Sequence, residues 1–361
     1  MRTFIEHLSR PVTILDGFWD FAFLGNVHPD QVHLPDINFT EKMAVPGCFD
    51  ATPQFAGKRG LTAYRKELLI TQPGRQRIAF DGVSHWCRVL INGNNLGEHV
   101  GGFVPFAFDF ELQSAGWVEL IVLVDNRFDA AQNPLHLDYF DWYQHGGIAR
   151  SVALHALGNA WIEDVRVTTL SVDPPTVEIQ VTLHADIPVT DTISVFVDEQ
   201  EVMSEEVDVV DVVTLRFDAT LEGAHLWSPE HPHLHFLRVN FGKDDRIERF
   251  GIRTIEVSTR KILLNGEPIR LLGFNRHELH VDFGHSFPDA LLLNDIQLLK
   301  SIHCNFVRGS HYPQDPRFLD LCDEHGLLVW SEGIGWQHTE QHINDPNFME
   351  AQKTHLAEMV Q

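Results

Sequence analysis

Residues 269–280, IRLLGFNRHELH, pass from an apolar run into a dense polar cluster. The first half has the composition of a buried strand, and we expect a strand over residues 269–274. The second half places Asn275, Arg276, His277, Glu278 and His280 directly after that strand. Such a cluster is either a solvated loop or the edge of a functional site. The segments that follow favour the functional site.

Strand-like and helix-like segments alternate after this stretch. Strands are predicted at residues 269–274, 304–309 (CNFVRG) and 327–330 (LLVW). Amphipathic helices are predicted at residues 288–302, 315–326, where Gly326 ends the helix, and 345–361. Alternation with short connections predicts right-handed βαβ units and a parallel sheet.

The carboxyl ends of parallel strands lie on one face of the sheet, and α/β folds place their chemistry there. The three predicted strands are followed by NRHE, RGSHYP and SEG. We therefore expect His277, Arg308, His311 and Glu332 to converge, although they are far apart in sequence. A single such residue is more often structural, but polar clusters at three successive strand ends favour a functional site.

Two metal-binding interpretations are disfavoured. HELH resembles the zinc motif H-E-x-x-H, but His277 and His280 are three positions apart and follow a strand, whereas that motif lies on a helix. Glu332 and His338 could ligate a cation beside the site, but a solvated carboxylate and a loop histidine explain them more simply. We predict no metal site.

The chain before this region is predicted to be all-β. Residues 1–157 contain short strands separated by turn signals such as Pro73-Gly74 and Asn92-Gly93, which is typical of a sandwich or jelly roll. Residues 158–255 form a second β block of immunoglobulin size, in which no chemistry is evident. Residues 256–361 then form the α/β region.

Composition limits the class of protein. A formal net charge of −24 argues against nucleic acid and anionic membranes as partners. The sequence has no apolar run long enough to span a bilayer and no evident secretory signal, so we expect a cytoplasmic protein. The cysteines Cys48, Cys87, Cys304 and Cys322 are widely spaced, and we expect buried free thiols.

The order of these blocks and the run GFNRHE…NFVRGSHYPQDPRFLDLCDEHGLLVWSE resemble glycoside hydrolase family 2, which contains β-galactosidases, β-glucuronidases and β-mannosidases. The segments VPGCFD (45–50), GGIARSVAL (146–154) and LWSPEHPHLHFLRV (226–239) agree with the same family. The resemblance implies a jelly-roll sugar-binding domain, an immunoglobulin-like β-sandwich and then the first three βα units of a (β/α)8 barrel. It also implies a carbohydrate substrate and, in the full-length enzyme, a homo-oligomer.

The resemblance implies a role in the sugar site for individual residues that match the family's motifs by position. His277 and His311 resemble histidines that hydrogen-bond the sugar, and Asp141 resembles an aspartate that reaches the sugar from the first domain. Arg308 resembles the arginine that orients the nucleophilic carboxylate, and Glu332 matches a recurrent barrel acid behind the site. In the family's metal-dependent galactosidase branch, the segment after this barrel acid carries a glutamate that binds the metal. Trp336 stands near that position in this sequence, which argues against bound magnesium. We therefore predict no cofactor.

The catalytic pair is not assigned. Retaining glycosidases need two carboxyl groups about 5–5.5 Å apart, and the family's Asn-Glu pair is absent from this sequence. Glu278 and Glu332 are the carboxylates expected at the strand ends, but the family pattern gives neither a catalytic role. We therefore expect the N-terminal part of a retaining exo-β-glycosidase, inactive by itself. The alternative is a non-catalytic carbohydrate-binding module.

Overall fold

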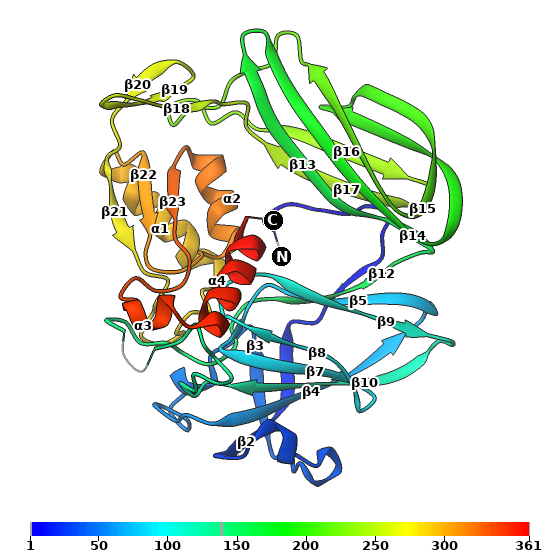
Figure 1. Cartoon of the computed structure of the whole chain (residues 1–361), viewed down its shortest axis with the longest axis vertical. Coiled ribbons are helices and arrows are strands. Elements are labelled where there is room, and N and C mark those ends of the chain that lie inside the picture. Colours follow the sequence, from blue (N-terminus) through cyan, green and yellow to red (C-terminus); the bar gives the residue numbers. More distant parts are fainter. Residues whose placement is uncertain (1, 138–139, 361) are drawn as a thin grey trace.

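Two β-sheets pack face to face in the first part of the chain (Figure 1). The computed structural model describes residues 2–137 and 140–360. One sheet has the strand order β1-β12-β5-β9, the other β3-β2-β4-β10-β7-β8, and β11 pairs with β6. The bounds are β1 Val12–Ile14, β2 Gly17–Gly25, β3 Glu41–Val45, β4 Leu61–Ile70, β5 Gly74–Phe80, β6 Val83–Ser84, β7 Trp86–Ile91, β8 Asn94–Val100, β9 Phe106–Leu112, β10 Gly116–Asp125, β11 Gly147–Ile148 and β12 Val152–Ala156, with short 3-10 turns at Pro29–Gln31, Leu34–Asp36 and Phe49–Ala51.

Alternation of apolar side chains along the strands produces the core between these sheets. Trp19 and Phe21 on β2 are fully buried, and Phe106, Phe108 and Phe110 on β9 pack against the same cluster from the other sheet. The β7–β8 hairpin turns at Asn92-Gly93, which have φ angles of 48° and 78°. Both angles are positive, as a tight two-residue hairpin turn requires, so the predicted turn is confirmed.

A five-stranded antiparallel sheet forms the second block. Its strands are β13 Ala160–Val172, β14 Pro175–Val197, β15 Gln200–Thr220, β16 His235–Phe241 and β17 Asp244–Phe250. The 23-residue β14 has a register irregularity between Ala185 and Val189 in its pairing with β15. The acidic stretch 198–211 lies largely within β15, an outer strand that pairs with β14 and is mostly exposed.

The last block contains the predicted parallel sheet. A small antiparallel sheet comes first: β18 Ile255–Ser258, β19 Lys261–Leu264 and β20 Glu267–Ile269. It is followed by β21 Gly273–Arg276, α1 Asp289–Ser301, β22 Phe306–Gly309, α2 Pro316–His325, β23 Leu328–Ser331, α3 Glu340–Ile343 and α4 Pro346–Met359. Apolar residues of α1, α2 and β22 share one buried cluster, so these helices cover the sheet.

The prediction of a buried strand over residues 269–274 is wrong in its bounds and burial. The sheet strand begins at Gly273, and Leu272 and Phe274 are exposed. The physical reason is position: β21 is an outer strand of a three-stranded parallel sheet, with β22 as its neighbour. An apolar run alone does not distinguish a central strand from an outer one.

All four cysteines are free and buried, as expected. Among the helices of the described residues, none combines the length and the apolar character needed to cross a bilayer.

Several buried histidines make stability depend on pH. Burial lowers the pKa of His136 and His285 to about 3 and that of His355 to about 4, from an ordinary value of 6.5. Because the folded state excludes protons that the unfolded chain accepts, unfolding becomes easier as pH falls below 6.5. Well below pH 6.5, each such histidine lowers the free energy of unfolding by about 1.4 kcal/mol per pH unit, until the pH reaches its pKa in the folded protein.

We therefore expect the free energy of unfolding, measured by urea titration, to fall steeply between pH 7 and pH 4.5. Neither ring nitrogen of His136 has a hydrogen-bond partner among the described residues, so His136→Phe should reduce that slope by about one proton. The exposed His33 provides the control, since His33→Phe should leave the slope unchanged. Equal slopes in the wild type and His136→Phe would contradict the assignment.

Candidate functional site

The ends of three parallel strands supply most of the predicted site. β22 lies between β21 and β23 and runs parallel to both, with Arg276 opposite Gly309 and Gly309 opposite Ser331. The residues just beyond these pairs therefore leave the same edge of the sheet. The prediction that the three strand ends share one face is confirmed.

Glu332 joins two of the expected residues. Its Oε1 accepts a hydrogen bond from Arg308 Nε at 2.6 Å, and its Oε2 lies 2.8 Å from His311 Nδ1. Burial favours the protonated carboxyl, but the hydrogen bonds from Arg308 and His311 outweigh it and hold the pKa of Glu332 below its ordinary value. Since a carboxylate only accepts, His311 Nδ1 carries the hydrogen, and Nε2 is the ring nitrogen left for a ligand.

His277 lies beside this group. Its ring centroid is 5.3 Å from that of His311, and Trp142 lies 5.6 Å from each of the two rings. Partial burial, followed by the neighbouring charge of His311, lowers the pKa of His277, whereas Asp141 acts in the opposite direction. A neutral imidazole suits hydrogen bonding to an uncharged hydroxyl group better than a fixed cation does.

Asp141 belongs to the jelly-roll part of the chain, on the segment that leads from β10 to β11. Asp50 anchors this segment to the sandwich. Its fully buried carboxylate accepts a hydrogen bond from Gly146 N at 3.1 Å and pairs with His145 Nδ1 at 2.9 Å. Arg59 adds a hydrogen bond to the carbonyl of Gln144 at 2.6 Å. The loop is thus fixed to its own sandwich, while the exposed Asp141 faces the strand ends.

Trp336 connects Asp141 to the barrel side. Its Nε1 donates to Asp141 Oδ1 at 3.4 Å, and its ring lies 5.2 Å from that of His311. The structure therefore brings Asp141, His277, Arg308, His311 and Glu332 together at one place, as the sequence predicted.

Glu278 is a correction to the sequence analysis. It was expected among the carboxylates at the strand ends, but it is fully buried. Its Oε1 accepts from Arg150 Nη2 at 3.1 Å and its Oε2 from the backbone nitrogen of Asp315 at 2.8 Å. The reason is alternation: His277 points into the site, so Glu278, the next residue, points into the protein.

Arg150 ties the two parts of the site together. It is 2% exposed, and besides Glu278 it donates to the carbonyl oxygens of Phe103 at 2.7 Å and Pro313 at 2.9 Å. Phe103 belongs to the jelly roll, whereas Glu278 and Pro313 flank His277 and His311 in sequence. One guanidinium therefore fixes the sandwich against the two segments that carry the histidines.

The cation site considered for Glu332 and His338 is not supported. Both oxygens of Glu332 are used by Arg308 and His311, and His338 Nε2 lies 3.2 Å from the carbonyl oxygen of Ile334. With that nitrogen donating, the ring is held in its own loop. His338 also packs on Phe348 at 4.7 Å.

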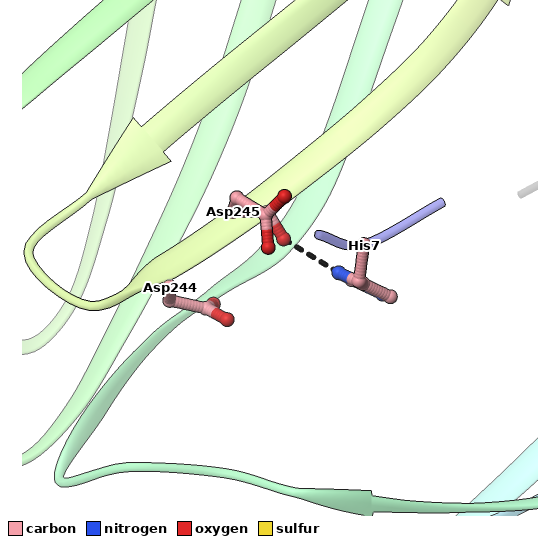
Figure 2. A group of neighbouring side chains, drawn as sticks. All are labelled: His7, Asp244 and Asp245. Atoms are coloured by element: carbon pink, nitrogen blue, oxygen red, sulfur yellow. Dashed lines mark hydrogen bonds between the residues drawn. The ribbon is translucent and has the colours of Figure 1, made fainter. Parts of the chain in front are cut away.

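A group of metal-ligand type does occur elsewhere among the described residues, at His7, Asp244 and Asp245 (Figure 2). His7 Nδ1 donates to the backbone carbonyl of Asp245 at 2.5 Å. The carboxylates are already satisfied: Asp245 accepts from the backbone nitrogens of residues 8–10, and Asp244 pairs with Arg10 at 2.6 Å. This group is a clamp that holds the N-terminal segment on the second sandwich.

Sequence reasoning missed Trp142, Trp336 and Arg150 as parts of the site. For Arg150 a signal existed, because an arginine within the otherwise apolar GGIARSVAL is costly unless it is paired. For Trp336 the family resemblance gave only its position after the third strand, near a metal-ligand glutamate. For Trp142 no signal existed, because its place depends on the packing of two domains.

Models of glycosyl hydrolases family 2 match the chain along nearly its whole length: the sugar binding domain at residues 12–158, the family's central domain at 160–253 and the TIM barrel domain at 255–359. The chain belongs to glycosyl hydrolase family 2. Its fold is the family's sugar-binding jelly roll, an immunoglobulin-like sandwich and part of a TIM barrel.

Similar proteins share this order. A β-galactosidase of Thermoanaerobacter pseudethanolicus is 32% identical over 322 residues, which is 84% of this chain and 42% of that protein. The crystal structure of a β-galacturonidase from Eisenbergiella tayi bound to galacturonate is 30% identical, with a TM-score of 0.90 over 99% of this chain and 64% of that one. A Bifidobacterium dentium β-glucuronidase complexed with coumarin-3-O-glucuronide has a TM-score of 0.86 at 26% identity and matches 67% of that chain. The chain thus spans less than half of the galactosidase and about two thirds of the solved structures.

The role of Arg150 can be measured as stability. Arg150→Met removes one partner of a buried ion pair and leaves Glu278 with only the longer contact to Arg276 at 3.5 Å, so we expect a loss of about 3 kcal/mol in the free energy of unfolding. The exposed Arg166 serves as the control, since Arg166→Met should cost no more than about 0.5 kcal/mol.

Adding Glu278→Gln to Arg150→Met should recover part of the loss, because it removes a buried charge that has lost its nearer partner. Equal stability of Arg150→Met and the wild type in urea titrations would show that the pair does not hold the domains together.

Proposed function

We propose that this chain forms the sugar-binding half of the active site of a retaining exo-β-glycosidase that acts on terminal β-linked sugars of the galactoside or glucuronide type. In this proposal Asp141, His277 and His311 hydrogen-bond the terminal sugar, and Arg308 and Glu332 hold His311 in place from behind. Family membership and the names of the similar proteins support the reaction class.

The convergence of Asp141 with His277 and His311 is the observation that carries the proposal. An exposed carboxylate from the jelly roll meets two imidazoles from separate strand ends, with the Trp142 ring packed beside both of them. A carboxylate, a neutral imidazole acceptor and an adjacent aromatic ring are suited to a ligand with several hydroxyl groups and an apolar ring face. The carboxylate of Asp141 would repel a sugar that itself carries a carboxylate. Tight binding of such a sugar therefore depends on cations such as Arg308.

Neither catalytic carboxylate is assigned within this chain. Glu278 is buried in a salt bridge with Arg150, and Glu332 is held by Arg308 and His311. We therefore infer that the 361-residue chain binds the sugar without hydrolysing its glycosidic bond. Release of nitrophenol from nitrophenyl β-glycosides by this chain would contradict that inference.

Sugar binding tests the proposal directly. Galacturonate, methyl β-D-galactopyranoside and methyl β-D-glucuronide can each be titrated into the chain by calorimetry or NMR. His311→Ala should weaken the Kd of the sugar that binds by roughly tenfold or more, because one hydrogen bond and its fixed geometry are lost. Asp141→Asn should weaken it as well.

The matched control is the exposed His33, since His33→Ala should bind as the wild type does. Retained circular dichroism would separate a binding defect from unfolding. If His311→Ala binds with the wild-type Kd, the assignment of the sugar contacts is wrong.

A further inference from the structure

Trp336 is a large exposed aromatic residue beside the proposed sugar contacts. It lies in the loop after β23, and 49% of its surface is accessible. Its neighbour Ile334, by contrast, is 1% exposed. Half-exposed tryptophans are costly to leave in water and are enriched where a partner or ligand covers them.

The loop that carries Trp336 is fixed. Gly335 N donates to the carbonyl of His311 at 2.8 Å, which ties the loop to the second strand end. Gly335 has a φ of 78°, and a Cβ added there would approach Phe140 at 2.9 Å. Glycine is therefore required at this turn, and the turn directs the next residue toward Asp141.

The single polar atom of the indole is engaged. Trp336 Nε1 donates to Asp141 Oδ1 at 3.4 Å. The ring is 5.2 Å from that of His311, with an interplanar angle of 41°. With its N–H directed at Asp141, the indole offers a ligand only its apolar π-face, which suits the C–H face of a pyranose ring.

We propose that Trp336 is a sugar-contact and positioning residue: its N–H orients the carboxylate of Asp141, and its ring forms the wall against which the sugar lies. The proposal rests on the proposed function, because it places Trp336 at the same sugar site. It makes the indole a determinant of specificity, since a hydroxyl group directed at the wall would lose its solvation without gaining a hydrogen bond.

Variants separate the two roles. Trp336→Phe keeps an aromatic wall and removes the N–H, so the Kd for the sugar should weaken a fewfold. Trp336→Ala removes both and should weaken it tenfold or more. In a double-mutant cycle, Trp336→Phe should cost less in the Asp141→Asn background than in the wild type, because the hydrogen bond they share is then already altered.

A spectroscopic readout accompanies the affinities. The chain has 8 tryptophans, and the indole N–H signal of Trp336 can be assigned in ¹⁵N-labelled protein by its loss in Trp336→Phe. That signal should shift in Asp141→Asn without sugar, and shift again when sugar saturates the wild type. Trp117 on β10 is 70% exposed, and Trp117→Phe is the control that should bind like the wild type.

The outcomes are distinguishable. Wild-type binding that is lost in His311→Ala but unchanged in Trp336→Ala would overturn this inference and leave the proposed function intact. An indole signal of Trp336 that stays in place at saturating sugar would do the same. Failure of the wild type to bind galacturonate, methyl β-D-galactopyranoside or methyl β-D-glucuronide would overturn both.

Discussion

The buried pair of Arg150 and Glu278 is the constraint on which the arrangement depends. Its charges come from different domains, and both are removed from water, with exposures of 2% and 0%. Such a pair adds little net stability, because desolvation offsets most of the attraction, but separating the partners is expensive. The interaction therefore specifies one relative placement of the jelly roll and the barrel strands. That placement is what the site requires.

The site follows from this placement because neither domain holds it alone. The sandwich supplies Asp141 on a loop anchored through Asp50, and the parallel strands supply His277 and His311. In the proposed site His277 faces the sugar, while the next residue, Glu278, pairs with Arg150. His311 likewise faces the sugar, while Pro313, two residues later, accepts a hydrogen bond from Arg150. The proposed sugar contacts and the contacts between domains thus share the same short segments, so a substitution in either motif is expected to affect both.

Much of this was accessible from sequence because periodicity and topology carry it. The alternation of strand and helix after residue 255 implies that the strand ends share a face, which predicts that His277, Arg308, His311 and Glu332 lie together. Burial was less accessible. Glu278 and His277 look equivalent in NRHE, and only the alternation of the backbone at the end of β21 assigns one to the interior. Likewise, the exposure of Phe274 depends on β21 being an outer strand, and the contact of Trp336 with Asp141 depends on domain packing that no local pattern encodes.

A crystal structure of the chain soaked with galacturonate would examine the shared pocket most directly. The sugar should lie with its hydroxyl groups within hydrogen-bonding distance of both the Asp141 carboxylate and His311 Nε2, so that groups from the two domains contact one ring. A sugar bound only to the jelly roll, only to the strand ends, or at another surface would contradict the view that the domains build a single site.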